Sequence, residues 1–173
     1  MNAAQHGTSE PAAYLPMVEI DMDIEVFSSN WAHCDRISTY VARMVSHNRA
    51  DSLLYSNLFS SALNELLETV FRSHSGEGSF VCAVRRCGEV DRIELCVPCG
   101  ADQIGFYRDA MTIVKSADAA DRYRQALFSS ETLDPAIGLL ELVVDYSAQL
   151  SIEPMDDDRI RLIADLALEE TEQ

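Results

Sequence analysis

A long amphipathic segment from Asp51 to His74 constrains the fold of this chain more than any other feature. Its apolar residues recur at helical spacing and form a stripe too wide to be left in water. Asp51 or Ser52 can cap a helix here, and the glycines of SGEG at 75–78 end it. The sequence therefore predicts a long helix that packs on a core through Leu54, Leu58, Ala62, Leu63, Leu66, Leu67 and Val70.

Three other segments have the patterns of β structure. Residues 17–27 alternate apolar and acidic side chains, which predicts a half-buried strand with an acidic outer face. Residues 79–98 form a hairpin around a Cys-Gly-Glu turn, and residues 150–168 form a second one around the acidic turn 155–158. These segments predict five strands.

Further helices are predicted between the strands. Ser28, Ser29 and Asn30 can cap a helix that runs to about Ser46, with Ile37, Tyr40, Val41 and Met44 on its buried face. Helical spacing also occurs over 102–115, 118–128 and 134–148. Together the elements predict an α/β fold, a two-layer sandwich with a mixed five-stranded sheet and helices on one face.

The length of 173 residues suits one domain, which we place at 17–168, between a flexible leader (1–16) and a frayed tail (169–173). A net charge of −16 repels nucleic acids and anionic membranes. No apolar run approaches the roughly 20 residues that span a bilayer, and the N-terminus lacks the pattern of a signal peptide. We therefore expect a cytoplasmic protein with reduced cysteines.

The cysteines and histidines give weak signals. Cys82, Cys87, Cys96 and Cys99 invite a zinc interpretation, but their spacing does not suit a zinc knuckle and strand positions of differing parity point to opposite faces. Small buried or half-exposed thiols are the favoured interpretation. The histidines do not have the spacing of metal ligands, so no metal site is predicted from them.

The polar residues of SALNELLETVFRSH (61–74) carry a resemblance to a known family. With this segment on the second helix, the order of elements resembles the GHKL-type (histidine-kinase-like) ATP-binding domain, especially anti-sigma-factor serine kinases and related bacterial regulators. That family has E-x-x-x-N on this helix, where the glutamate positions water or substrate and the asparagine holds Mg²⁺. The resemblance places Glu65 on the glutamate, as a catalytic carboxylate, and Thr69 on the asparagine, and it implies a Bergerat-like fold.

Two other motifs of the family are degenerate in this sequence. Of the adenine-reading D-x-G-x-G, the segment 98–102 keeps Gly100, has Pro98 in place of the acid, and carries Asp102 four residues further on. Of the glycine pair that wraps the phosphates, Gly138 is kept and Ala136 replaces its partner. The resemblance therefore implies a nucleotide site built from Thr69, Gly100, Asp102 and Gly138, with losses at each motif.

These losses favour a protein without a cofactor. Replacing a buried carboxylate that reads adenine costs about 1–3 kcal/mol of binding and most of the base selectivity. The resemblance then implies a catalytically degenerate regulator of bacterial signal transduction, which docks a regulatory protein through residues 100–133 or the first helix. One alternative is an active serine kinase or ATPase with ATP and Mg²⁺, which uses Glu65 as base and Thr69 as Mg²⁺ ligand. Another is a homodimeric interaction domain without a ligand. A purely structural interpretation is also open, in which Glu65 is a solvated polar residue and Gly138 only allows a helix to pack on the sheet.

Overall fold

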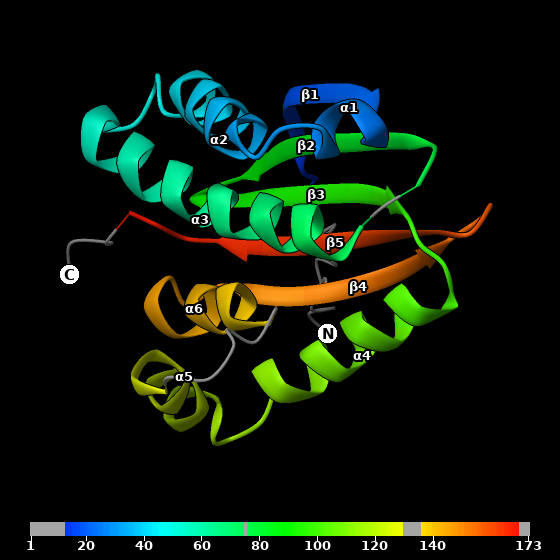
Figure 1. The fold of residues 1–173 in the computed structure, drawn as a ribbon. Coiled ribbons are helices and arrows are strands. Elements are labelled where there is room, and N and C mark those ends of the chain that lie inside the picture. Colours follow the sequence, from blue (N-terminus) through cyan, green and yellow to red (C-terminus); the bar gives the residue numbers. More distant parts are fainter. Residues whose placement is uncertain (1–12, 75, 130–135, 170–173) are drawn as a thin grey trace, which may run out of the picture.

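The computed structural model describes residues 13–74, 76–129 and 136–169, in which one five-stranded sheet is covered by helices (Figure 1). The strands lie in the order β1-β2-β3-β5-β4, and every pairing is antiparallel. The prediction of a mixed sheet was wrong. β3 and β4 run in the same direction, but β5 lies between them and pairs antiparallel with both, so the sheet has no parallel pair. The strands are β1 (Leu15–Asp23), β2 (Ser79–Cys87), β3 (Val90–Pro98), β4 (Gln149–Met155) and β5 (Arg159–Leu166).

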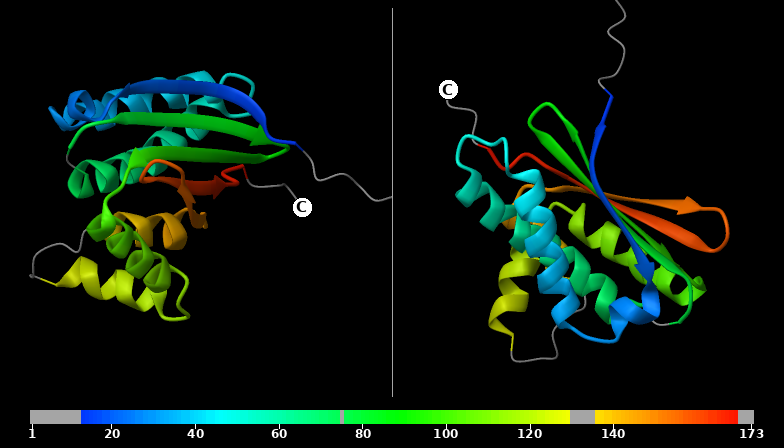
Figure 2. Two further views of the ribbon diagram at one scale, coloured as in Figure 1. Left: turned by 90° about the vertical axis from the view of Figure 1, so that its right-hand side faces the viewer. Right: turned by 90° about the horizontal axis from the view of Figure 1, so that it is seen from above.

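The helices lie on one side of the sheet, and the other face of the sheet is open (Figure 2). This arrangement confirms the predicted two-layer α/β sandwich. Helix α3 crosses the middle of the sheet, with α2 on one flank and α6 on the other, and α5 packs on α6. The helices are α1 (Ile24–Ser28), α2 (Ala32–Val45), α3 (Ser52–Ser73), α4 (Ala101–Val114), α5 (Ala119–Phe128) and α6 (Ile137–Asp145).

The core lies between α3 and the inner face of the sheet. Phe59, Leu63 and Leu66 of α3 are buried, and alternate residues of β2 and β3 are buried with them. Phe27 of α1 stacks on Phe80 of β2 with 4.6 Å between the ring centroids. Within the described ranges, no helix is both long and apolar enough to cross a bilayer.

The first strand is shorter at its C-terminal end than predicted. It begins at Leu15, inside the predicted leader, and ends at Asp23, where the chain turns into α1. Ile24 and Phe27 are buried at helical spacing, whereas Val26, which alternation placed on the inner face, is 53% exposed. The amide of Ile24 donates to the carbonyl of Gly78 at 2.8 Å, which holds this turn against the chain entering β2.

Helix α2 buries Ile37 and Val41 as predicted, but its buried face is rotated away from the other two predicted residues. Tyr40 and Met44 are 55% and 52% exposed, while the smaller side chains of Ser38 and Ala42 are buried against α3. Small residues allow the two helices to approach closely, and this favours their burial over that of larger apolar side chains. The N-cap residue of α2 is Trp31, which makes no side-chain capping bond, although the predicted Asn30 accepts the amide of Ala32 through Oδ1 at 2.9 Å.

The long helix matches its prediction along most of its length. Asp51 caps it by accepting the amide of Leu54 at 2.9 Å. In the first turns, however, Tyr55 and Phe59 are buried while Leu54 is 55% exposed, so the stripe predicted there was displaced by one residue. The helix predicted over 134–148 is α6, which is shorter at its C-terminal end, and residues 134 and 135 lie outside the described ranges.

A buried ionic cluster joins β2, β3, α3, the α2–α3 loop and Glu169 at one end of the sheet, and the sequence did not predict it. Asp91 of β3 is fully buried and accepts two hydrogen bonds from Arg86, at 2.6 and 2.9 Å. The hydroxyl of Tyr55 donates to the same carboxylate. Arg49, from the α2–α3 loop, lies 3.4 Å from Asp91 and 2.9 Å from Glu169, the first residue of the predicted tail. The cluster therefore ties the helical layer to the sheet.

Candidate functional site

The crossing of α3 and α6 brings three of the five predicted site residues together. Gly138, in the first turn of α6, lies against Glu65 and Thr69 on adjacent turns of α3. A Cβ atom at Gly138 would be 2.9 Å from Glu65 Oε2, 3.3 Å from Thr69 Oγ1 and 3.4 Å from the carbonyl oxygen of Glu65. The two helices are therefore in direct contact at this point, and a side chain at position 138 would have to displace the carboxylate of Glu65 and press on Thr69 Oγ1.

The hydroxyl of Thr69 is used within its own helix. Thr69 is 1% exposed, and Oγ1 donates to the carbonyl of Glu65 at 2.9 Å. This bond to the residue four positions earlier is the usual way in which a threonine satisfies its hydroxyl inside a helix. Thr69 is thus satisfied without a metal ion.

Several carboxylates surround this contact. Burial and the neighbouring Glu141 and Glu68 raise the pKa of Glu65 to about 7. Burial and Asp145 also raise the pKa of Glu141. Glu68 has polar partners, since it accepts hydrogen bonds from Asn64 and Arg72, both at 2.8 Å. The site is therefore acidic, and its nearest cation is already paired with Glu68.

Glutamine at position 65 should stabilise the protein in a pH-dependent way. Since the pKa of Glu65 rises from about 4.5 in the unfolded chain to about 7 on folding, the folded protein keeps a proton that the unfolded chain releases. Wild-type stability is then expected to fall as pH rises between these two values. Allowing for solvent screening of this half-buried group, Glu65→Gln should be more stable than wild type by about 1–2 kcal/mol at pH 8, and equal to it near pH 4.

Urea unfolding at pH 4 and pH 8 measures this difference. Glu77→Gln, which removes the same charge from an exposed loop, is the matched control and should behave like wild type at both values. A gain of equal size at both pH values would show that burial of the Glu65 charge is not the cause.

The other two predicted site residues, Gly100 and Asp102, lie elsewhere. Gly100 caps α4, and its amide donates to Gln103 Oε1 at 2.5 Å, while Asp102 is exposed in the first turn. Figure 1 shows the N-terminal end of α4 near the C-terminal end of α3, whereas α6 crosses α3 closer to the middle of that helix. Nine residues separate Glu65 from the last turn at His74, a distance of about 13 Å along a helix. The structure thus brings Glu65, Thr69 and Gly138 into contact, and it places Gly100 and Asp102 near the C-terminal end of α3.

Aromatic and polar side chains fill the space between α4 and the end of α3. Tyr107 of α4 is fully buried, and its hydroxyl lies 2.7 Å from His74 Nε2 and 3.0 Å from Ser73 Oγ. Burial lowers the pKa of His74 to about 4, so its ring is neutral at pH 7. The sequence did not predict this contact, because the two residues are 33 positions apart and no local pattern relates them.

The cysteines do not form a metal centre in the part of the chain that the structure describes. Cys82 lies on the helix-covered face of the sheet, and Cys96 lies on the open face. No group of three or more potential ligands is close enough to hold a metal ion among the described residues. Burial raises the pKa of Cys82 to about 12, so its thiol is protonated at pH 7. Cys82, Cys96 and Cys99 are buried and Cys87 is half-buried, as the interpretation of buried or half-exposed thiols predicted.

Comparison with known proteins adds no family to this description: no protein-family model matches the chain, and no curated protein or solved structure is significantly similar to it.

Proposed function

We propose that this protein is a catalytically inactive, GHKL-like regulator of bacterial signal transduction, which acts by binding another protein in the cytoplasm. The order of helices and strands on which the resemblance rests is also the order in the structure, with the short α1 added. Under this proposal, residues 100–133 or α2 provide the surface for a regulatory partner.

The contact of Gly138 with Thr69 is the observation that carries this proposal. In a working site, Mg²⁺ and the triphosphate would lie between the residue at position 69 and the glycine segment. Mg²⁺ holds its ligands at about 2.0–2.1 Å, so oxygens on its opposite sides are about 4 Å apart, and a backbone amide needs about 3 Å more to reach phosphate. A Cβ at Gly138 would instead be 3.3 Å from Thr69 Oγ1, so α6 occupies that space.

The charges around the contact support the same conclusion. Glu65, Glu68 and Glu141 lie near one another, and like charges would repel a triphosphate. Arg72, the cation beside them, is bound to Glu68 and lies over the ring of Trp31. A nucleotide here would therefore have to displace a formed ion pair.

Calorimetry with ATP and Mg²⁺ tests the proposal. Up to millimolar nucleotide, we expect no heat of binding that changes when Thr69 is replaced. The reason is that α6 occupies the space that the phosphates of ATP would need beside Thr69. Thr69→Ala removes the hydroxyl, and Ser129→Ala, on an exposed residue, is its control. Low-micromolar binding that Thr69→Ala abolishes and Ser129→Ala leaves unchanged would overturn the proposal.

An active kinase is the second candidate, because the raised pKa of Glu65 is typical of a general base. It requires phosphate transfer from ATP to a protein, and Glu65→Gln would then abolish the transfer. Self-association is the third candidate, favoured by the exposed Tyr40 and Met44 on α2. Light scattering distinguishes it, since a monomer has a mass of 19.2 kDa.

A further inference from the structure

We propose that the groove between α2 and the first half of α3 binds a phosphate group. This groove has a volume of about 370 Å³ and lies on the far side of α3 from Gly138. It is therefore a different place from the degenerate nucleotide site, and the inference does not depend on the proposed function. The groove is lined by Thr39, Arg43, Ser46, His47, Ser52, Leu53, Ser56, Asn57 and Ser60.

The chemistry of the lining suits an oxyanion. Leu53 is the one apolar residue in the lining, and the others carry hydroxyl, amide, imidazole or guanidinium groups, all of which can donate hydrogen bonds. The lining contains no carboxylate, in a chain that has 29 acidic residues. The hydroxyls of Ser46 and Ser60 already donate to Arg43 O and Ser38 Oγ, so the preference for an anion rests on the guanidinium, the remaining donors and the absence of carboxylates.

Arg43 provides the positive charge of the groove. Most arginines of this protein, such as Arg49, Arg72 and Arg92, are held by carboxylates. Arg43 has no ion pair and no side-chain hydrogen bond among the described residues, although acidic groups outnumber basic ones in the chain. Its guanidinium is thus available to an external anion, and hydrogen bonds between charged groups are the strong ones.

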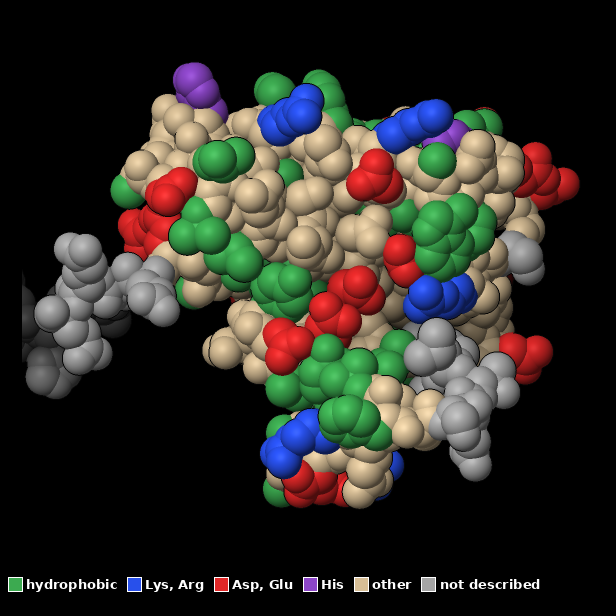
Figure 3. Space-filling model, turned by 60° about the vertical axis from the view of Figure 1, so that its left-hand side comes forward, with side chains coloured by type: hydrophobic (Ala, Val, Ile, Leu, Met, Phe, Trp, Pro, Cys, Tyr) green, Lys and Arg blue, Asp and Glu red, His purple; other side chains and the backbone are tan. Residues whose placement is uncertain are grey.

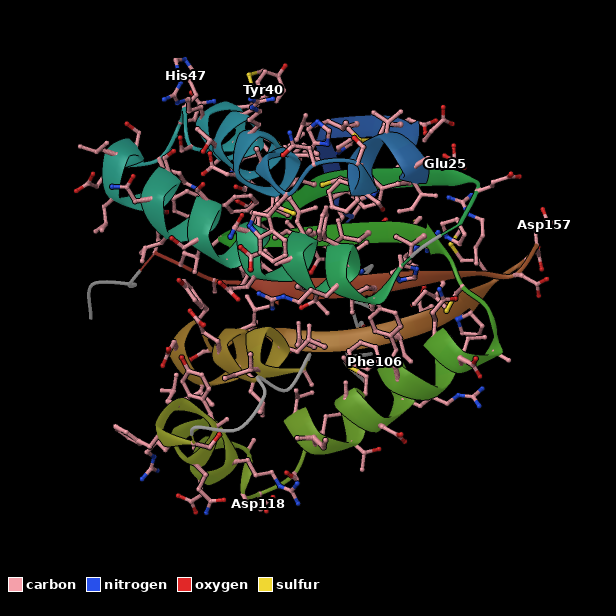
Figure 4. All side chains as sticks on the ribbon, in the orientation of Figure 1. Glu25, Tyr40, His47, Phe106, Asp118 and Asp157 are labelled. Carbon is pink, nitrogen blue, oxygen red and sulfur yellow. The ribbon has the colours of Figure 1, made fainter. Side chains whose placement is uncertain are left out.

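The surroundings of the groove differ from the rest of the surface. Figure 3 shows basic, histidine and hydrophobic side chains along the upper edge of the molecule, and acidic side chains across its middle and at the left below this edge. In Figure 4, Tyr40 of α2 and His47 of the loop after α2 project away from the body of the protein. Asp51, at the start of α3, is not part of the lining, and its Oδ1 accepts the amide of Leu54.

A phosphomonoester fits the lining better than a carboxylate does. Its dianion has three terminal oxygens that can each accept several hydrogen bonds, and the groove offers hydroxyls from both helices around one guanidinium. The phosphate group is the shared chemistry of two sources, a small phosphorylated molecule and a phosphorylated side chain of a partner protein.

Amide chemical shifts of the ¹⁵N-labelled protein test this inference with inorganic phosphate. We expect saturable shifts at the end of α2 and the start of α3, and none with sodium chloride at the same ionic strength. Arg43→Gln should weaken binding roughly tenfold or more, as expected for loss of a charged hydrogen bond. Arg36→Gln is the matched control, because Arg36 is exposed on the same helix but lies outside the groove.

The ligand's source is distinguished by titrating phosphoserine and a serine peptide with and without phosphorylation. Tighter binding of the phosphopeptide than of phosphoserine identifies a protein ligand, and equal binding identifies a small molecule. ATP bound through this groove would respond to Arg43→Gln and not to Thr69→Ala, which separates it from the nucleotide site. Equal shifts with phosphate and chloride, or equal weakening by Arg43→Gln and Arg36→Gln in folded variants, would overturn the inference.

Discussion

Replacing Asp91 by alanine is expected to lower the free energy of unfolding by about 3–5 kcal/mol, the usual effect of breaking a buried ion pair from one side. The carboxylate is fully buried, with Arg86, Arg49 and the Tyr55 hydroxyl around it. Its removal leaves two positive charges and a phenol without their common partner. Because water cannot replace that partner in the interior, the cost should far exceed that of a surface pair.

Urea unfolding at pH 7 measures this loss, and Asp165→Ala is the matched control. Asp165 pairs with Arg92 through two hydrogen bonds of 2.7 and 2.8 Å, but both side chains are partly exposed. Its removal is expected to cost about 1 kcal/mol or less. Equal losses for the two variants would show that burial does not set the strength of the Asp91 cluster.

A leucine at position 138 is expected to destabilise the protein by about 3 kcal/mol, because it overpacks the contact between α6 and α3. The first side-chain atom alone would be 2.9 Å from the carboxylate of Glu65 and 3.3 Å from Thr69 Oγ1. Glu65 can rotate away, but the remaining leucine atoms would also meet the backbone of α3. The helices would then have to separate.

Gly105→Leu separates this effect from helix propensity. Gly105 lies within α4, and a Cβ atom there meets no other atom within 4 Å. Leucine should therefore stabilise that helix by up to about 1 kcal/mol. Thermal and urea unfolding of both variants provide the comparison. If Gly138→Leu were also stabilising, α6 would not be seated on α3 as described, and the main support for a filled nucleotide site would be lost.

The elements of the fold were predictable because they depend on local patterns. The hairpin of β2 and β3 follows from two alternating runs around Gly88, whose φ of +58° suits a glycine. The face of α2 could not be predicted from hydrophobicity alone. Ser38 and Ala42 are buried because α3 packs closely on α2. The sequence of α2 alone does not indicate which side α3 will cover.

The candidate site was predictable only in part for the same reason. Family resemblance placed Glu65, Thr69 and Gly138 in one site, and the structure places them in contact. Gly100 and Asp102 came from the same resemblance but lie at the start of α4 and not where α6 meets α3. The contact of Tyr107 with His74 depends on how α4 packs, which no motif encodes.

The order of the strands has a consequence for the nascent chain on the ribosome. β3 is central in the sheet, yet its second neighbour is β5, the last strand to be synthesised. β4 emerges earlier but pairs with β5 and not with β3. Until Arg159–Leu166 has left the ribosome, β3 therefore presents an unpaired edge that other chains can join. The sheet is therefore completed near its centre, by the strand that follows the other four in the chain.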